Sequence, residues 1–218
     1  MKNEKKKSKK DNEKNSGDSN DNNASQCATD WKEHMSDCIK CLNHMDRDNG
    51  HKVTEDLKDI SNYTVVVSQT GARTMKVLIG LARATWIVTS EWIEQSFNEG
   101  KWLPPDAFQW SHYTKPLDES AEKTKKQTLF HGLRVHVRQG RENYNVFPTS
   151  AQLETLVELC GANVVMDDSC DYDYIISEKE IEPKIAGKNI RNKPIVSAQW
   201  LFDSLQHFER LPIDSYKI

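Results

Sequence analysis

Two segments of this sequence, about 108 residues apart, repeat the same pattern. WIVTSEWIEQSF begins at Trp86, and PIVSAQWLFDSL begins at Pro194. Each segment opens with a short apolar run typical of a buried strand. A hydroxyl residue that can cap a helix follows (Ser90 or Ser197), and then a helix with an early tryptophan. Repeats of roughly 20–50 residues build solenoids, so this longer period predicts two copies of one domain in tandem.

Helices and strands alternate around both landmarks. One helix is predicted from an apolar stripe made of Trp31, Met35, Cys38, Leu42 and Met45. The first half continues with a strand over 63–67, a helix over 73–84, a strand over 86–88 and a helix over 91–98. The second half has predicted strands over 133–137, 163–165, 174–176 and 194–196 and helices over 150–159 and 199–208. This alternation predicts the α/β class, with a small parallel sheet flanked by helices in each domain.

Composition sets the predicted domain boundaries. Residues 1–25 are rich in lysine and contain no aliphatic side chain larger than alanine apart from Met1, so they are predicted to be a disordered tail. The cluster KKKSKK within this tail is typical of a nuclear import signal or of a solubilising tail. A first domain over 26–110, a linker over 111–128 and a second domain over 129–218 complete the predicted organisation.

Several classes of protein are disfavoured by composition. No stretch approaches the roughly 18 consecutive apolar residues of a membrane span, so no membrane partner is expected. The net charge of −3 argues against a chain that coats nucleic acid along its whole length. Five cysteines without regular spacing are predicted to be reduced thiols in a cytosolic or nuclear protein.

Several short segments make the chain resemble tandem BRCT domains. They are RTMKVLIGLA from Arg73, LFHGL from Leu129, FPT and QLE within 147–154, and LCGA from Leu159. The likeness spans roughly residues 29–218, and the spacing is similar to the BRCT pairs of the breast-cancer type 1 susceptibility protein and of its RING-bearing partner. The resemblance implies two domains packed head to tail, which bind a phosphoserine in the first domain and an aromatic residue three positions later in a groove between the domains.

The resemblance places a phosphate site at the start of the 73–84 helix. Lys76 stands at the family's phosphate-contacting lysine, with Thr74 beside it, and a lysine near a helix N-terminus suits a phosphate dianion. The alternative is that Lys76 is a solvated helix lysine. The family also uses a serine-glycine pair on its first strand, but the residues before the first helix here lack a strand pattern. Ser25 and Gln26 are the nearest stand-ins, and a side chain at the glycine position would crowd the phosphate.

The same resemblance implies the contacts to the rest of the peptide. Arg73 would contact a peptide carbonyl through its planar guanidinium, with Asp203 as the acid that orients it. Leu78, Phe147 and Phe202 map to the apolar pocket for the aromatic residue. The alternative for Phe147 and Phe202 is that they belong to the core between the domains.

Other chemistry finds little support in the sequence. Cys38 and Cys41, followed by His44, form a single CxxC pair, whereas a structural zinc site usually needs two converging ligand pairs. The acidic run over 167–173 lacks the glycine and the terminal glutamate of a calcium loop. No nucleophile–base motif or glycine-rich phosphate loop occurs. We therefore predict no metal, no cofactor, no small-molecule substrate and no enzymatic activity.

The sequence leaves three functional hypotheses. The leading one is a nuclear, non-enzymatic adaptor of the DNA-damage response that binds a phosphorylated protein with a pSer-x-x-Phe-like motif. The second is a BRCT scaffold or dimerisation module that does not need phosphate, which the missing first strand favours. The third is binding to DNA ends, with the lysine-rich tail assisting, and such binding should fall steeply with salt.

Overall fold

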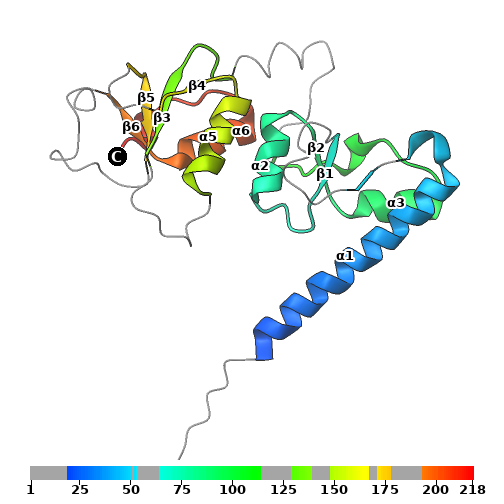
Figure 1. The fold of residues 1–218 in the computed structure, drawn as a ribbon. Helices are drawn as coiled ribbons and strands as arrows, with labels where there is room; N and C mark the ends of the chain where they lie inside the picture. Colours follow the sequence, from blue (N-terminus) through cyan, green and yellow to red (C-terminus); the bar gives the residue numbers. More distant parts are fainter. Residues whose placement is uncertain are drawn as a thin grey trace, which may run out of the picture.

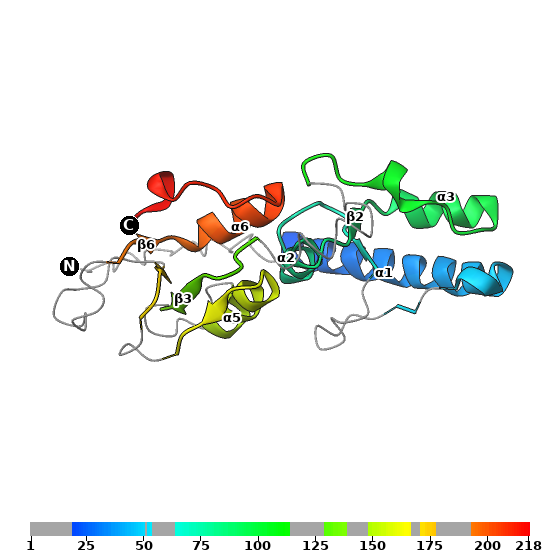
Figure 2. The same ribbon diagram turned by 90° about the horizontal axis from the view of Figure 1, so that it is seen from above.

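The computed structural model describes residues 19–50, 52–53, 64–113, 129–138, 148–166, 171–177 and 193–218, and over 19–29 and at 49 it describes the backbone alone. These residues form two α/β domains, which lie next to each other with α2 facing the helices of the second domain (Figures 1 and 2). No helix among the described residues is long and apolar enough to cross a membrane.

In its described residues, the first domain has two short parallel strands between layers of helix. Its elements are α1 (Ser19–Met45), β1 (Val65–Val67), α2 (Met75–Ala82), β2 (Trp86–Val88) and α3 (Glu91–Glu99). β1 and β2 pair in parallel. Val66 and Ile87 belong to an apolar cluster with α2, whereas Val88 belongs to a second cluster with α1 and α3. Both faces of the small sheet are therefore covered, as its run of β-branched residues predicts.

The predicted apolar stripe of α1 is confirmed in the C-terminal half of the helix. Met35, Cys38 and Leu42 are buried and pack against Trp92 of α3. Met45 is the exception, because it is 49% exposed as the last residue of the helix. The stripe therefore faces α3 from Met35 to Leu42, about two helical turns, and ends before Met45.

The start of α1 corrects the predicted tail. The helix begins at Ser19, so residues 19–25 are helical and not disordered. Figure 1 shows this first part of α1 projecting away from the rest of the molecule. The sequence missed it because residues 19–29 carry no apolar stripe from which a helix could be recognised.

The second domain has a larger parallel sheet. Its elements are β3 (Arg134–Val137), α5 (Ser150–Leu159), β4 (Asn163–Val164), β5 (Tyr174–Ile176), β6 (Ile195–Val196) and α6 (Ala198–His207). The strand order is β4-β3-β5-β6, and every neighbouring pair is parallel. Thr149 is the N-cap of α5 and forms a capping box with Gln152. The Ser197 hydroxyl accepts from the backbone N–H of Gln199 at the start of α6. Ser90 makes no such side-chain bond at the start of α3, unlike its predicted role.

The tryptophans and serines of the sequence repeat have the same structural role in both domains. The indole N–H of Trp92 donates to the Leu103 carbonyl at 2.7 Å, and that of Trp200 donates to the Leu211 carbonyl at 2.8 Å. The buried hydroxyls of Ser96 and Ser204 accept from the backbone N–H of the same two leucines. Each pair thus fastens the segment that follows the last helix of its domain, which explains why the repeat keeps these residue types.

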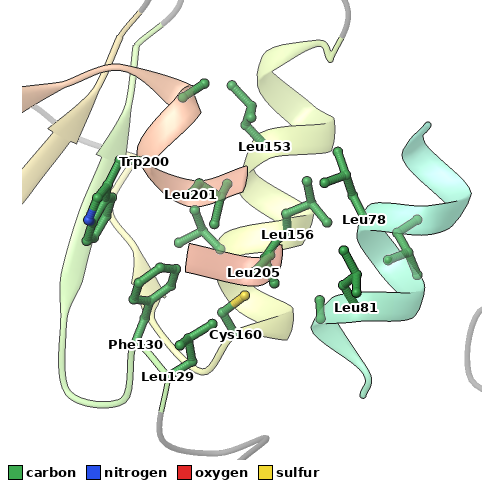
Figure 3. Close-up of a cluster of buried hydrophobic side chains, with 14 of the residues drawn as sticks. Leu78, Leu81, Leu129, Phe130, Leu153, Leu156, Cys160, Trp200, Leu201 and Leu205 are labelled. Atoms are coloured by element: carbon green, nitrogen blue, oxygen red, sulfur yellow. The ribbon is translucent and has the colours of Figure 1, made fainter. Parts of the chain in front are cut away.

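The two domains share one apolar core at their junction. Leu78 and Leu81 of α2 face Leu153 and Leu156 of α5 and Leu205 of α6 (Figure 3). All five are at most 3% exposed, and burying a leucine side chain stabilises by about 1.5–3 kcal/mol. The junction therefore fixes α2 against α5 and α6 of the second domain.

The first domain extends beyond its predicted end at residue 110. Tyr113, which the sequence assigns to the linker, is only 3% exposed and belongs to the shared core. Trp110 packs against the same core, and its indole N–H donates to the Ser68 carbonyl at 3.0 Å. The segment up to Tyr113 is therefore part of the folded domain.

Candidate functional site

The loop from β1 to α2 is held in a fixed shape by its own hydroxyls. The Ser68 hydroxyl accepts from the backbone N–H of Gly71 at 3.1 Å, and the Thr70 hydroxyl accepts from that of Ala72 at 3.3 Å. Gly71 has a φ of +65°, and a Cβ at this position would lie 2.8 Å from the His112 ring. Tyr113 donates its hydroxyl hydrogen bond to the Gly71 carbonyl. The loop thus presents the next residues, Arg73 to Lys76, from a rigid base.

α2 begins immediately after this loop. Thr74 is its N-cap, and the threonine hydroxyl accepts from the backbone N–H of Val77 at 3.4 Å. Lys76 lies in the first turn and is partly exposed, while Thr74 is exposed. The start of α2 therefore combines a lysine with the positive end of a helix dipole, which together favour an anion.

Arg73 reaches across the junction to the second domain. Its Nη1 donates to Asp203 Oδ1 of α6 at 2.6 Å, so the sequence expectation that these two residues pair is met in the structure. Asp203 also accepts from Gln199 Nε2 at 2.7 Å and from the Tyr216 hydroxyl at 3.0 Å. A second contact across the junction runs from Gln206 Nε2 to the His112 carbonyl at 3.1 Å.

The hydrogen bonds around Asp203 control its ionisation. Partial burial of the carboxyl disfavours the charged form, but the bonds from Arg73, Tyr216 and Gln199 outweigh it and lower the pKa of Asp203. The pKa of Tyr216 is raised, first by desolvation and then by its bond to Asp203. Asp203 is thus an anion that holds the Arg73 guanidinium at neutral pH.

The remaining expected site residues lie in different surroundings. Leu78 is 1% exposed and belongs to the junction core, so in this structure it does not line an open pocket. Phe202 of α6 is partly buried and packs against the same core. Phe147 lies outside the described residues.

Ser25 and Gln26 are not brought to the start of α2. Both lie in the first part of α1, which Figure 1 shows at a distance from α2. The described residues begin with α1, so the first strand expected from the resemblance is not tested by them. The candidate site therefore consists of Arg73, Thr74 and Lys76 from the first domain together with the Asp203 side of the second.

Tyr216 and Gln199 are the members of this site that sequence reasoning missed. Gln199 stands one turn before Asp203 on α6, so helical spacing alone could have suggested the contact. Tyr216 follows α6 in a short 3-10 helix (Asp214–Tyr216), and no local pattern points to it.

A metal centre finds no support in the described residues. No group of three or more histidine, cysteine, aspartate or glutamate side chains there is arranged to hold an ion. Cys38 and Cys160 are buried thiols, and burial raises the pKa of both.

Comparison with known proteins identifies the two domains. A model of the BRCT domain matches residues 128–217, and a model described as the Regulator of Ty1 transposition protein 107 BRCT domain matches residues 4–110. The chain carries two BRCT domains. The first match begins inside the predicted disordered tail, as α1 does, so the similarity to this BRCT domain extends into residues 1–25.

Curated relatives of this BRCT pair are much longer proteins. Microcephalin of Gorilla gorilla gorilla is 25% identical over 178 residues, which are 79% of this chain and 20% of that protein. Mediator of DNA damage checkpoint protein 1 of Rattus norvegicus is 24% identical over 149 residues, 64% of this chain and 11% of that protein. The chain therefore spans about a fifth or less of the length of these relatives.

A solved BRCT structure has the same overall fold. In a complex structure of Rtt107p and a phosphorylated histone, the similar chain is 15% identical, with a TM-score of 0.56 over 83% of this chain and 85% of that one. At this identity the likeness establishes the fold of the pair and nothing finer. The particular likeness to the breast-cancer type 1 pair remains an expectation from sequence.

Proposed function

We propose that this chain is a non-enzymatic adaptor that binds a phosphoserine peptide across the junction of its two BRCT domains. The phosphate would bind at the start of α2, to Lys76 and the hydroxyl of Thr74. Arg73 would donate to a carbonyl of the peptide backbone. We further propose that the protein acts in the nucleus, in the response to DNA damage.

The position of Arg73 carries this proposal. Asp203 holds one nitrogen of its guanidinium at 2.6 Å, while the arginine side chain remains 37% exposed. The other guanidinium N–H groups have the planar geometry to donate to a peptide at the junction. Lys76 stands three residues further on, so a bound chain could present a phosphate to Lys76 and a carbonyl to Arg73 together.

The relatives support the same function. The structure with a TM-score of 0.56 is a complex of Rtt107p with a phosphorylated histone. One curated relative is named as a mediator of the DNA damage checkpoint. A tandem BRCT pair that binds a phosphorylated nuclear protein is therefore the function we favour for this chain.

The preference for an aromatic residue at the third position after the phosphoserine is the finest part of the proposal. Because Leu78 is buried, the aromatic ring would rest mainly on Phe202, which is partly exposed on α6. Phe147 is proposed as a second wall of this subsite. The preference should consequently be modest, and replacing the aromatic residue by leucine should cost less than removing the phosphate.

Fluorescence anisotropy tests the proposal. The probes are a labelled pSer-x-x-Phe peptide, its unphosphorylated twin and a phosphorylated histone peptide, each titrated with the full chain. We expect the phosphopeptides to bind at least tenfold more tightly, because a charge-assisted hydrogen bond contributes about 1.5–3 kcal/mol. Equal binding of the phosphorylated and unphosphorylated peptides contradicts the proposal.

A scaffold that needs no phosphate is the second candidate. It is favoured by the position of Ser25 and Gln26, the expected stand-ins for the family's serine-glycine pair, which lie in α1 and away from the start of α2 (Figure 1). Equal affinity for the two peptide forms would support it.

A labelled DNA duplex in the same assay tests binding to DNA ends. If the chain binds DNA ends, its affinity for the duplex should fall by roughly a thousandfold or more between 50 and 200 mM salt.

A further inference from the structure

Asp203 has two carboxylate oxygens, and both accept hydrogen bonds from other side chains. Oδ1 accepts from Arg73 Nη1 at 2.6 Å and from Gln199 Nε2 at 2.7 Å. Oδ2 accepts from the hydroxyl of Tyr216 at 3.0 Å. The terminal torsion of an aspartate is broad, so a carboxylate held at one oxygen alone is free to rotate. The bond from Tyr216 fixes Oδ2, and together with the bond from Gln199 it keeps Oδ1 directed at Arg73.

Tyr216 is itself fixed to the sheet of the second domain. Its carbonyl accepts from the backbone N–H of Ser197 at 2.9 Å, beside an antiparallel bridge between Val196 and Lys217. Its ring packs against the shared core. The hydroxyl that bonds Asp203 therefore belongs to a segment that is fixed to β6. Tyr216 and Asp203 together connect β6 to the Arg73 side chain of the first domain.

We infer that Tyr216 is a positioning residue for the peptide-binding arginine, and that it acts on Arg73 through Asp203. The inference rests on the proposed function. It adds the segment after α6 to the residues that orient the peptide-binding arginine. The expected consequence is a loss of phosphopeptide affinity of about three- to tenfold when the hydroxyl is removed. This is less than the full contribution of a charge-assisted hydrogen bond, because Tyr216 acts on the peptide only through Asp203 and Arg73.

The test uses the full chain with Tyr216→Phe, which removes the hydroxyl and keeps the ring. Tyr174→Phe is the matched control, because the Tyr174 ring also packs against the second-domain core but lies outside the Asp203 cluster. Phosphopeptide anisotropy is measured for both variants, alone and with Arg73→Gln. The NMR signal of the Arg73 side-chain N–H groups is followed in the absence of peptide.

The inference predicts that Tyr216→Phe weakens phosphopeptide binding three- to tenfold and shifts or broadens the NMR signal of Arg73. In the Arg73→Gln background, Tyr216→Phe should not weaken binding further. Tyr174→Phe should change neither the affinity nor the Arg73 signal. An unchanged Arg73 signal in Tyr216→Phe, or an equal loss of affinity with and without Arg73, overturns the inference. If wild type binds no phosphopeptide but Tyr216→Phe still changes the Arg73 signal, the proposed function fails and the positioning of Arg73 stands.

Discussion

One aspartate joins residues from distant parts of the sequence at the junction of the two domains. Asp203 on α6 binds Arg73, which is 130 positions earlier in the chain, and Tyr216, which lies 13 positions later. Its side chain is 22% exposed, so these bonds are only partly screened by water. A single substitution at this carboxylate should therefore affect both the stability of the pair and the orientation of Arg73.

Asp203→Asn should destabilise the protein in a pH-dependent way. The pKa of Asp203 is lower in the folded protein than the value of about 3.9 in an unfolded chain, so its contribution is fully present above that value. It is lost as the pH falls through the folded pKa. We expect the free energy of unfolding of the variant to be about 1–2 kcal/mol lower than that of wild type at pH 7, and this difference to shrink below pH 4. Urea denaturation at pH 7, 5, 4 and 3 measures this.

Asp214→Asn is the control for that series. Asp214 is 81% exposed and pairs with Lys217 three residues away, a surface contact that contributes little. Its substitution should leave the free energy of unfolding nearly unchanged at every pH. A difference for Asp203→Asn that stays constant from pH 7 to pH 3 contradicts the assigned role of its charge.

At the scale of elements, α2 has three roles. Its N-terminus carries Thr74 and Lys76, one face carries Leu78 and Leu81 to the second domain, and Gly80 faces the first-domain sheet. A Cβ at Gly80 would lie 2.7 Å from Ile87 Cδ1 and 2.8 Å from Val66 Cγ2. Because these are tips of β-branched core residues, glycine permits α2 to approach the sheet closely.

Gly80→Ala should therefore destabilise the first domain, although alanine is the better helix former. Overpacking of this kind costs about 1–3 kcal/mol, which exceeds the roughly 1 kcal/mol that alanine contributes to a helix. Urea denaturation measures the change. Gly50→Ala is the matched control, because Gly50 has an ordinary φ of −60° and its nearest contact is the Asn43 side chain. A Gly80→Ala protein that is more stable than wild type contradicts the close packing of α2 on the sheet.

At the scale of the whole molecule, we expect the junction to make one folding unit of the two domains. Leu81 is 3% exposed within a cluster that also contains α5 and α6 residues, so neither domain presents these side chains to water in the pair (Figure 3). The orientation of Arg73 toward Asp203 depends on the same packing. The apolar junction thus stabilises the fold and positions the site.

Leu81→Ala should lower the stability of both domains together. Truncation of a buried leucine costs about 2–5 kcal/mol, and the shared core transmits the loss across the junction. Tryptophan fluorescence and far-UV circular dichroism should report one coincident urea transition, shifted to lower urea. Met166→Ala is the control, because Met166 is 72% exposed and its truncation should be nearly neutral. Two separate transitions in wild type contradict the single folding unit.

The periodicity of apolar residues predicted most of the helices and strands, because it reflects which residues of an element face the core and which face solvent. The strand over 86–88 and the helix over 150–159 are present as predicted, since apolar periodicity reflects burial directly. The start of α1 at Ser19 carries no such pattern and was missed. The exposure of Met45 was missed because the stripe continues to the last helical residue, where the packing against α3 has ended.

The candidate site was less accessible to sequence reasoning. The Arg73–Asp203 pair came from resemblance to a family, because no periodicity relates residues 130 positions apart. Tyr216 was missed for the same reason, since its partner is chosen by the tertiary fold. The burial of Leu78 also depends on how the two domains pack, which determines whether an apolar residue lines a pocket or fills a core.

The most direct test of the account is the energetic coupling between the peptide phosphate and Lys76. Phosphorylated and unphosphorylated pSer-x-x-Phe peptides are titrated into wild type, Lys76→Met and the control Lys101→Met, which alters an exposed lysine just after α3. The account predicts that Lys76→Met removes at least about 1.4 kcal/mol of the phosphate-dependent binding energy, a tenfold change, while Lys101→Met keeps it. The same preference for phosphate in wild type and Lys76→Met would contradict a phosphate site at the start of α2.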